Sequence, residues 1–361
     1  MSPAYRIAST CCLSQLHPTI TMASVWDELD GLLDSPSSFT AAPGDRGTIK
    51  DKHDFNAEED VEALREAIEG AGTTEKTLIE ILACRSHAQR QVICKAYEEA
   101  TGRALVDDLE GDTGGDFMRL LVALVTPPAQ YDCNEIKRAM QGAGTNDSAL
   151  IEIFASRSNE QIHAFSAAYL EEKERKLTYD LKSEISGEYG TALLILAEGE
   201  RDEDTDEDPE EKAKEDAMAL YEAGEKKWGT DESKFIDILC HRSIRQLRQT
   251  LVEFKKLSGK TLQESIEGEM SGELQELLVA VVKCVKNVPA YLAEKLYESM
   301  KGGGTDEATL SRIMVSRSEV DLLDIRAEFK RLYEGSLHSA IESDVSGDYG
   351  DCLKIICGGE D

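Results

Sequence analysis

Four carboxylate residues stand at one constant distance from a short glycine-rich segment that occurs four times in the chain. The distance from the last glycine of each segment to its carboxylate is 40 residues in every case. The pairs are Gly72 with Asp112, Gly144 with Glu184, Gly229 with Glu269, and Gly304 with Asp344. Glycines allow turns that leave backbone carbonyls uncovered, and a carboxylate beside such a turn would add a charged oxygen ligand. An oxygen-only site of flexible geometry suits Ca²⁺ better than Mg²⁺, because Mg²⁺ requires a tighter octahedron.

The composition of such a site predicts weak binding by the protein alone. Three carbonyls and a bidentate carboxylate supply about five oxygens, whereas Ca²⁺ takes roughly six to eight. Only one ligand is charged, so we expect dissociation constants on the order of 10⁻⁴–10⁻³ M. A phospholipid phosphate would supply both the missing oxygen and the missing negative charge. Calcium and anionic lipid should therefore each raise the affinity for the other.

An alternative is that the segment Gly-x-Gly-Thr is only a turn between two helices with an N-cap. One such segment would leave the two interpretations equal. Four segments, each with its carboxylate at the same distance, favour the cation site.

The glycine segments recur at intervals of 72, 85 and 75 residues, which is typical of an array of repeated modules. The longest interval contains an acidic stretch that we interpret as a solvated connector, with a weak cation site as the less favoured alternative. The predicted organisation is a tail over 1–54, repeats over 55–126 and 127–197, the connector over 198–212, and repeats over 213–287 and 288–361.

Apolar residues recur at helical spacing within each repeat, and no stretch alternates convincingly at the period of a strand. We therefore predict an all-α fold with about five helices per repeat. In the first repeat, one face of the first helix is Val61, Leu64 and Ile68, and one face of the second is Leu78, Ile81 and Leu82. The fifth helix of each repeat is apolar nearly all round, as over 120–125 and 277–282, and should lie in the core.

Polar residues at constant positions predict where the helices begin. We expect the threonine after each glycine segment to be the N-cap of the second helix, namely Thr73, Thr145, Thr230 and Thr305. An Arg-Ser pair follows, and its serine should open the third helix in a capping box, less strongly in the fourth repeat. These pairs are Arg85-Ser86, Arg157-Ser158, Arg242-Ser243 and Arg317-Ser318, with Gln89, Gln161, Gln246 or Asp321 three residues after the serine. We favour hydrogen bonding within the repeat for the arginines over a direct functional role.

The net charge of −31 argues against nucleic acid as a partner, and against an anionic membrane unless cations intervene. No apolar stretch is long enough to span a bilayer, and residues 1–25 contain no apolar run of signal-peptide length. The nine cysteines lack zinc-site spacing. We interpret Cys84, Cys94, Cys240 and Cys284 as buried thiols of a reducing compartment. We hypothesise that Cys11 or Cys12 forms a disulfide with a core cysteine under oxidising conditions.

The N-terminal tail contains one amphipathic stretch, 26–33, which could form a short helix that docks on the body of the protein. Trp26 would then be an apolar anchor, and a loosely packed tail residue is the equal alternative.

At the glycine segments the chain resembles the annexins. The segment Met300-Lys-Gly-Gly-Gly-Thr-Asp-Glu307 is similar to the annexin calcium loop almost letter for letter, and Lys227-Trp228-Gly229-Thr230-Asp231 is similar to the third-repeat form. The resemblance covers about 55–361. It implies a slightly curved disc with calcium loops on the convex face and the tail on the concave face. The implied ligands are Ile68, Gly70, Gly72 and Asp112; Met140, Gly142, Gly144 and Glu184; Gly224, Lys227, Gly229 and Glu269; and Met300, Gly302, Gly304 and Asp344.

The predicted function is calcium-dependent, reversible binding to anionic phospholipid such as phosphatidylserine, with several Ca²⁺ ions bridging loops and lipid phosphates. Trp228 would enter the lipid interface, with a packed core tryptophan as the alternative. A role in membrane organisation, trafficking or repair would follow. We expect a cytoplasmic protein that joins membranes peripherally when calcium is present, and exit from the cell by an unconventional route stays open. The alternative function is a helical-repeat scaffold whose tail or acidic connector recruits protein partners.

We expect no catalysis. The chain has no Gly-x-Ser-x-Gly elbow, no P-loop and no His-Glu-x-x-His, and His163, Cys240 and His241 are isolated.

Overall fold

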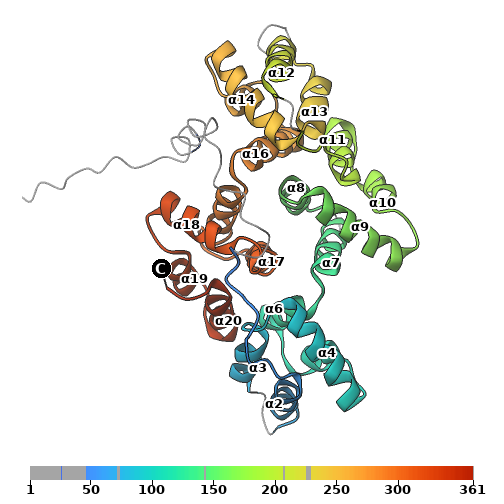
Figure 1. The fold of residues 1–361 in the computed structure, drawn as a ribbon, viewed down its shortest axis with the longest axis vertical. Helices are drawn as coiled ribbons and strands as arrows, with labels where there is room; N and C mark the ends of the chain where they lie inside the picture. The colour runs from blue at the N-terminus through green and yellow to red at the C-terminus, as the bar shows by residue number, and fades with distance from the viewer. Residues whose placement is uncertain are drawn as a thin grey trace, which may run out of the picture.

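The computed structural model of this chain describes residues 26, 46–70, 74–141, 144–205, 208–224 and 229–360. Over these residues the protein is all-α, with nineteen helices and no strand, as predicted. Figure 1 shows the helices in four groups arranged around the centre of the molecule.

Each group contains five helical segments. The first contains α2 (Ala57–Glu69), α3 (Glu75–Leu82), α4 (His87–Thr101), α5 (Leu105–Asp112) and α6 (Gly115–Val125). The second contains α7 (Pro128–Met140), α8 (Asp147–Ser156), α9 (Asn159–Lys173), α10 (Leu177–Glu184) and α11 (Gly187–Glu198). The third contains α12 (Glu210–Ala223), α13 (Glu232–His241), α14 (Ile244–Ser258), α15 (Leu262–Glu269) and the first part of α16 (Gly272–Ser299). The fourth contains the rest of α16, α17 (Glu307–Arg317), α18 (Leu322–Tyr333), α19 (Leu337–Asp344) and α20 (Gly347–Cys357).

Helix α16 is two helices joined at a kink. Asn287 has φ −164° and ψ 102°, outside the helical region. Its Oδ1 accepts a hydrogen bond from the Ala290 N–H at 3.0 Å, so Asn287 is the N-cap of the second part. Pro289 lies in the first turn after that cap, where its missing N–H has no helical partner to lose. The prediction of about five helices per repeat is therefore confirmed.

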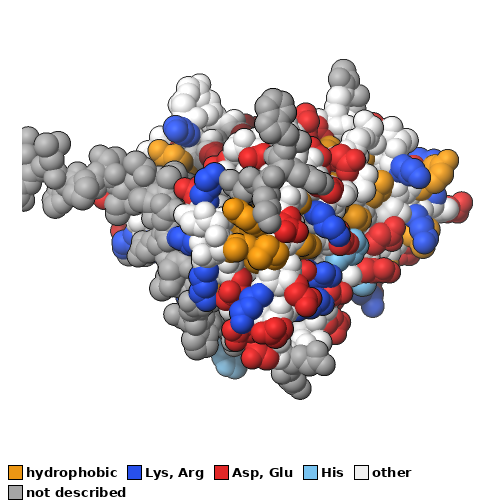
Figure 2. Space-filling view, turned by 90° about the horizontal axis from the view of Figure 1, so that it is seen from above, with side chains coloured by type: hydrophobic (Ala, Val, Ile, Leu, Met, Phe, Trp, Pro, Cys, Tyr) orange, Lys and Arg blue, Asp and Glu red, His pale blue; other side chains and the backbone are white. Residues whose placement is uncertain are grey.

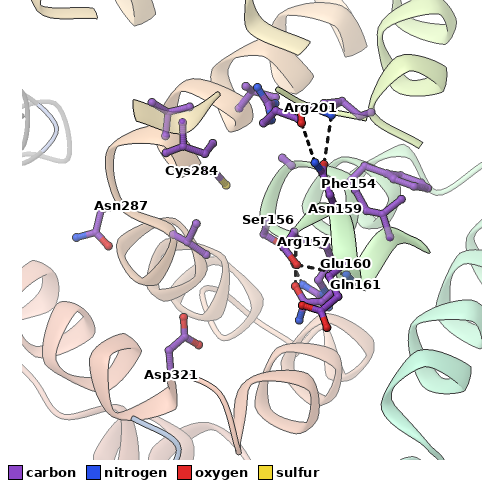
Figure 3. Close-up of a pocket in the computed structure, with 18 of the residues that line it drawn as sticks. Phe154, Ser156, Arg157, Asn159, Glu160, Gln161, Arg201, Cys284, Asn287 and Asp321 are labelled. Carbon is purple, nitrogen blue, oxygen red and sulfur yellow. Dashed lines mark hydrogen bonds between the residues drawn. The ribbon is translucent and has the colours of Figure 1, made fainter. Parts of the chain in front are cut away.

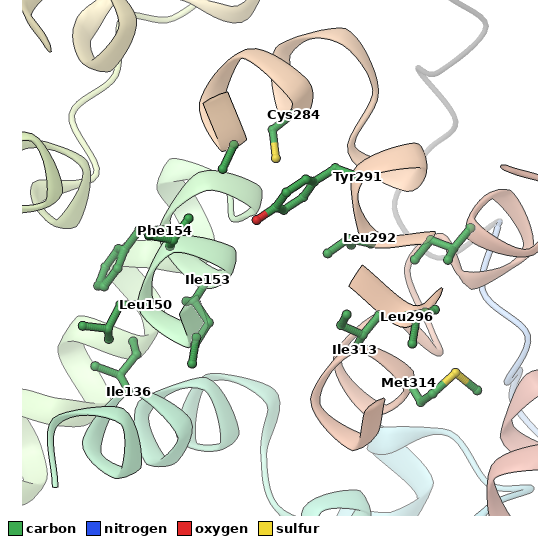
Figure 4. Packing of buried hydrophobic residues seen from close by; sticks show 14 of the residues in the cluster. Ile136, Leu150, Ile153, Phe154, Cys284, Tyr291, Leu292, Leu296, Ile313 and Met314 are labelled. Atoms are coloured by element: carbon green, nitrogen blue, oxygen red, sulfur yellow. The ribbon is translucent and has the colours of Figure 1, made fainter. Parts of the chain in front are cut away.

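The repeats pack in pairs that meet at the centre. Repeat one contacts repeat four through α3 and α6 against α20, and repeat two contacts repeat three through α11 against α13 and α16. Across the centre, α8 packs on α16 and α7 packs on α17. Figure 4 shows this junction, where Tyr291 and Leu292 of α16 point toward α8, and Ile153 of α8 lies on the facing side. The apolar fifth helices form much of the core, as predicted from their composition.

The capping boxes predicted for the third helix are confirmed in repeats one and two, only the serine cap is present in repeat three, and the prediction is wrong in repeat four. Ser86 and Ser158 form complete capping boxes, and Ser243 caps α14 through the Gln246 N–H. Ser318 instead follows the last residue of α17, and α18 begins only after Asp321. The Ser318 carbonyl accepts hydrogen bonds from the Thr48 and Ile49 N–H groups at 2.7 and 3.0 Å. In repeat four this turn receives the tail instead of opening a helix.

The arginines beside these serines make paired hydrogen bonds within their own repeats, as expected. Arg85, Arg157 and Arg242 bind Asp60, Asp132 and Asp216, respectively, through Nε and Nη2 at 2.7–3.0 Å. Repeat four has Leu292 at the corresponding position of its first helix. There Arg317 turns to Asp321, with Nε–Oδ1 and Nη2–Oδ2 distances of 2.7 and 2.6 Å. Because the Asp321 carboxylate binds Arg317, it makes no capping hydrogen bond at the start of α18.

The end of the tail is a strap that joins repeats one and four, and we define it as residues 46–52. Its Arg46 carbonyl accepts from the Leu323 N–H, and the Lys52 N–H and carbonyl both bond to the Gln89 side chain. The Thr48 hydroxyl donates to the Ile356 carbonyl at 2.6 Å. The strap contacts the ends of α17 and α20 and the start of α4, which lie away from the glycine segments.

We expect Gly47→Val to loosen the strap. A Cβ atom at Gly47 would lie 2.5 Å from the Glu319 Cα, and backbone cannot move aside as a flexible side chain can. The free energy of unfolding should fall by about 1–3 kcal/mol, as is usual for overpacking. Trypsin should also cut faster at Arg46. Chemical unfolding in chelator measures the first effect, and timed proteolysis measures the second.

Gly303→Val is the matched control, because a Cβ there meets nothing within 4 Å. Equal stability of the two variants would show that the strap does not hold the repeats.

Earlier in the tail, Trp26 is an apolar anchor and not a loosely packed residue, which were the two alternatives left by the sequence. Its side chain is 3% exposed and belongs to the core cluster. The ammonium groups of Lys283 and Lys286 lie 5.2 and 5.9 Å from the ring centroid, within the range of cation–π attraction. The rest of the amphipathic stretch, 27–33, lies outside the described residues.

The connector is more tightly held than a solvated stretch would be. Arg201 donates to the Leu239 and Arg242 carbonyls at 2.8 and 2.7 Å, and the Asp202 N–H donates to the His241 carbonyl. These carbonyls at the end of α13 need donors, and Arg201 provides them. Desolvation lowers the pKa of Arg201. The neighbouring acids Asp202, Glu203 and Asp204 remain exposed.

The cysteine prediction is partly wrong. Cys240 and Cys284 are buried and Cys94 is half-buried, but Cys84 is exposed because it lies in the turn after α3. Burial raises the pKa of the Cys94 thiol to about 11 and that of Cys240 to about 12, so both are protonated at neutral pH. Cys11 and Cys12 lie outside the described residues.

Candidate metal centres

The four carboxylates that sequence spacing singles out occupy one structural position. Each is the last residue of an eight-residue fourth helix: Asp112 of α5, Glu184 of α10, Glu269 of α15 and Asp344 of α19. Three residues later the fifth helix begins at a glycine with φ between 63° and 71°. These glycines are Gly115, Gly187, Gly272 and Gly347. A left-handed residue at this point requires glycine, and it turns the chain sharply just after each carboxylate.

The glycine segment of each repeat is closed by a backbone hydrogen bond that sequence reasoning missed. The residue after each threonine donates its N–H to a carbonyl near the end of the first helix. The donors and acceptors are Thr74 to Ala67 at 3.2 Å, Asn146 to Ala139 at 2.8 Å, Asp231 to Ala223 at 3.0 Å, and Asp306 to Ser299 at 2.8 Å. Donor and acceptor are seven residues apart, or eight in the third repeat. This near-constant spacing is the feature of the sequence from which the bond could have been predicted. The bond brings the end of the first helix and the start of the second helix together at the two ends of the segment.

The threonines are not the N-caps that we expected. The N-caps of α3, α8, α13 and α17 are Thr74, Asn146, Asp231 and Asp306, one residue further on. Two of the threonines instead bond to the distant carboxylates. The Thr305 hydroxyl donates to Asp344 Oδ2 at 2.7 Å, and the Thr230 hydroxyl lies 3.2 Å from Glu269 Oε2. In repeats three and four these bonds place the glycine segment beside its carboxylate.

The loop residues are placed in different ways. Ile68 and Met140 lie in the last turns of α2 and α7, and Gly224 and Met300 are the C-caps of α12 and α16. Among the described glycines of the segments, Gly224 is buried. The exposed ones are Gly70, Gly144, Gly229, Gly302 and Gly304. Gly229 and Gly302 have φ of 89° and 116°, as a glycine turn predicts. Gly72, Gly142, Lys227 and Trp228 lie outside the described residues.

The candidate donors are one carboxylate and backbone oxygens in each repeat, because the described residues contain no cluster of acidic side chains. Within the described ranges, no three His, Cys, Asp or Glu side chains converge on a point. Asp112, Glu184 and Glu269 are exposed and Asp344 is half-buried, so solvent and external ligands can reach them. Such a set of oxygens fits a hard cation that completes its coordination from outside the protein.

The surface offers no separate basic face at the edge shown in Figure 2, where acidic and basic side chains are interspersed. With a net charge of −31, attraction to an anionic surface therefore has to be local. No helix among the described residues has the length and apolar character to cross a bilayer.

A pocket of about 600 Å³ lies where repeats two, three and four meet. Figure 3 shows the Cys284 sulfur and the Asp321 carboxylate pointing toward it, with Arg201 hydrogen-bonded to Asn159 on its wall. The pocket lies at the end of α8 away from the glycine segment. Both acidic side chains and arginines line it, so its charges select no single class of ligand.

Comparison with known proteins gives one consistent result. The family model described as Annexin matches residues 59–124, 131–196, 215–281 and 291–356. Human Annexin A3 is 54% identical over 318 residues, which cover 88% of this chain and 98% of that protein. Human Annexin A4 is 49% identical over 315 residues, covering 87% and 98%.

Solved structures agree. The structure named Annexin III has a TM-score of 0.86 and 54% identity, with coverage of 88% of this chain and 99% of that chain. Calcium-bound annexin (Sm)1 has a TM-score of 0.76 and 37% identity, with coverage of 88% and 94%. These matches span all four repeats.

Proposed function

This chain belongs to the annexin family, and we propose that it binds anionic phospholipid membranes reversibly through Ca²⁺ ions that bridge its loops to lipid phosphates. Calcium-dependent phospholipid binding is the general property of the family. The calcium-bound state of annexin (Sm)1, a structural relative, supports the choice of metal. We propose no catalytic activity.

The observation that carries this proposal is the fourfold recurrence of one arrangement. Each repeat has a closed glycine segment and a carboxylate at the end of its fourth helix. The ligands we propose in each repeat are three loop carbonyls and this carboxylate. They are Ile68, Gly70, Gly72 and Asp112; Met140, Gly142, Gly144 and Glu184; Gly224, Lys227, Gly229 and Glu269; and Met300, Gly302, Gly304 and Asp344.

Charge explains why lipid and calcium should bind together. Each site would retain about one positive charge after its carboxylate is counted, and four ions leave the protein strongly acidic overall. The attraction is thus confined to the loops, where a lipid phosphate completes the coordination of each ion. Each ligand raises the affinity for the other by the same factor.

Further parts of the proposal concern the rest of the molecule. Trp228, in the third glycine segment of the sequence, would enter the lipid interface, where tryptophan is favoured. The repeats would span 55–126, 127–197, 213–287 and 288–361, with the tail over 1–54 and the connector over 198–212. The protein would act in the cytoplasm on membrane organisation, trafficking or repair.

Sedimentation with vesicles tests the proposal. We expect binding to phosphatidylserine vesicles at submillimolar to millimolar calcium, full release by chelator, and little binding to phosphatidylcholine alone. The bound fraction should rise at lower calcium when the phosphatidylserine content is increased, because the two ligands are coupled. Binding that persists in chelator, or no binding at millimolar calcium, would reject the proposal.

A further inference from the structure

We propose that Thr305, and more weakly Thr230, are positioning residues that hold the calcium-ligand carboxylates ready, so that repeats four and three bind calcium more tightly than repeat two. This inference rests on the proposed calcium sites. Beyond those sites, it assigns a role to threonines that are not themselves metal ligands. It also ranks the repeats by their affinity for calcium.

The contact is strongest in repeat four. The Thr305 hydroxyl donates to Asp344 Oδ2 at 2.7 Å, a length typical of a strong bond to an ionised acceptor. Both residues are half-buried, so the bond competes less with water than a fully exposed one. The two residues are 39 apart in the chain, and the bond joins the first loop of the repeat to the end of α19.

Repeat three has a weaker form of the same contact. The Thr230 hydroxyl lies 3.2 Å from Glu269 Oε2 and 3.3 Å from the Glu269 carbonyl, so it is shared between two acceptors. Glu269 is exposed, and glutamate has one more rotatable bond than aspartate. The carboxylate of repeat three is therefore held less firmly than that of repeat four.

Repeat two provides the contrast within the same chain. Thr145 and Glu184 are both described, and no hydrogen bond joins them. Glu184 is exposed at the end of α10. Its side chain has no such hydrogen bond to hold it before calcium binds, whereas Asp344 is held by Thr305.

The bond to threonine leaves the carboxylate able to bind metal. An ionised carboxylate has about four lone-pair sites, and a hydroxyl occupies one of them. The remaining sites are left for a cation. Partners of this kind orient metal ligands, and their loss costs roughly 10–100-fold in metal affinity.

The test isolates one site at a time in the full-length chain. A repeat-four protein carries D112N, E184Q and E269Q, and a repeat-two protein carries D112N, E269Q and D344N. Calcium chloride is titrated into each by calorimetry without lipid, and unfolding by urea in chelator is measured in parallel. In the repeat-four protein, T305V should weaken calcium binding about 10–100-fold, and T305S should restore most of it.

The matched control is T145V in the repeat-two protein, which should change calcium affinity less than about 2-fold because no bond is lost. The unmodified repeat-four protein should also bind more tightly than the unmodified repeat-two protein. Equal affinity with and without T305V, or tighter binding by T305V, would overturn the inference. Failure of the natural chain to bind calcium at all would instead reject the proposed function. A loss that T305S does not rescue, with reduced stability in chelator, would mean that Thr305 only supports the fold.

Discussion

Replacing Arg312 by methionine should lower the free energy of unfolding by about 3–5 kcal/mol, because it leaves buried carboxylates without their cation. Arg312 of α17 binds Glu152 of α8 through Nη2 at 2.5 Å and Nε at 3.0 Å. Its Nη1 lies 3.5 Å from Glu135 of α7. The side chains of the arginine and the two glutamates are 3%, 1% and 2% exposed, so water cannot replace the lost partner. The cluster joins repeat two to repeat four at the centre of the molecule.

The effect should depend on pH in one direction. Burial raises the pKa of Glu135 above its ordinary value, while Arg138 and Arg312 oppose the rise. An acid whose pKa is higher in the folded state favours folding at lower pH, and that contribution is lost as pH rises through the raised pKa. Without Arg312 the pKa of Glu135 should rise further. The deficit of the variant should therefore shrink when urea unfolding is measured at pH 5 instead of pH 7.

Two controls make the result specific. Arg138→Met removes a cation that also binds Glu135 but is 58% exposed, so it should cost less than about 1 kcal/mol. The double variant R312M with E152M replaces the Arg312–Glu152 pair and leaves Glu135 bound to Arg138. It should recover most of the loss, because an apolar pair of similar volume is often neutral. A deficit below 1 kcal/mol for R312M, or equal losses in the single and double variants, would contradict a pairing role.

Features that depend on local sequence were predictable. Helix faces such as Leu78, Ile81 and Leu82 are buried as their spacing indicates, and Ser86 and Ser158 form capping boxes because every partner lies within three residues. The recurrence of glycine and carboxylate 40 residues apart indicated a repeated site, although the fold was needed to show that each carboxylate ends a helix.

Features that depend on distant partners were not predictable. Ser318 is not an N-cap because its carbonyl binds the strap 270 residues away. Thr305 is not an N-cap because its hydroxyl binds Asp344 across the repeat. The central cluster joins residues 160 apart, and the only local sign of it was a charged Glu152 within the apolar run of α8. The local sequence pattern identifies unusual residues, but only the folded structure shows which distant residues they contact.

Replacing all four carboxylates that are paired with the glycine segments by their amides should strongly raise the calcium concentration needed for binding to phosphatidylserine vesicles. The variant is D112N, E184Q, E269Q and D344N. Each substitution removes the only charged ligand of its proposed site, while keeping the size and shape of the side chain. Calcium affinity in such modules depends on the number of charged ligands, and we expect the calcium needed for half-maximal binding to rise on the order of 100-fold. Co-sedimentation over a calcium series measures this shift.

The change in net charge cannot by itself explain weaker binding by this variant. Four amides raise the net charge from −31 to about −27, which should weaken the general repulsion from an anionic vesicle. If repulsion alone governed binding, the variant would bind better than the natural chain at every calcium concentration. A control with four amides at exposed acids away from the loops, Glu99, Glu160, Asp202 and Glu203, carries the same charge and should keep its calcium requirement. Unchanged binding by the loop variant would show that the carboxylates at the ends of α5, α10, α15 and α19 do not hold the ions.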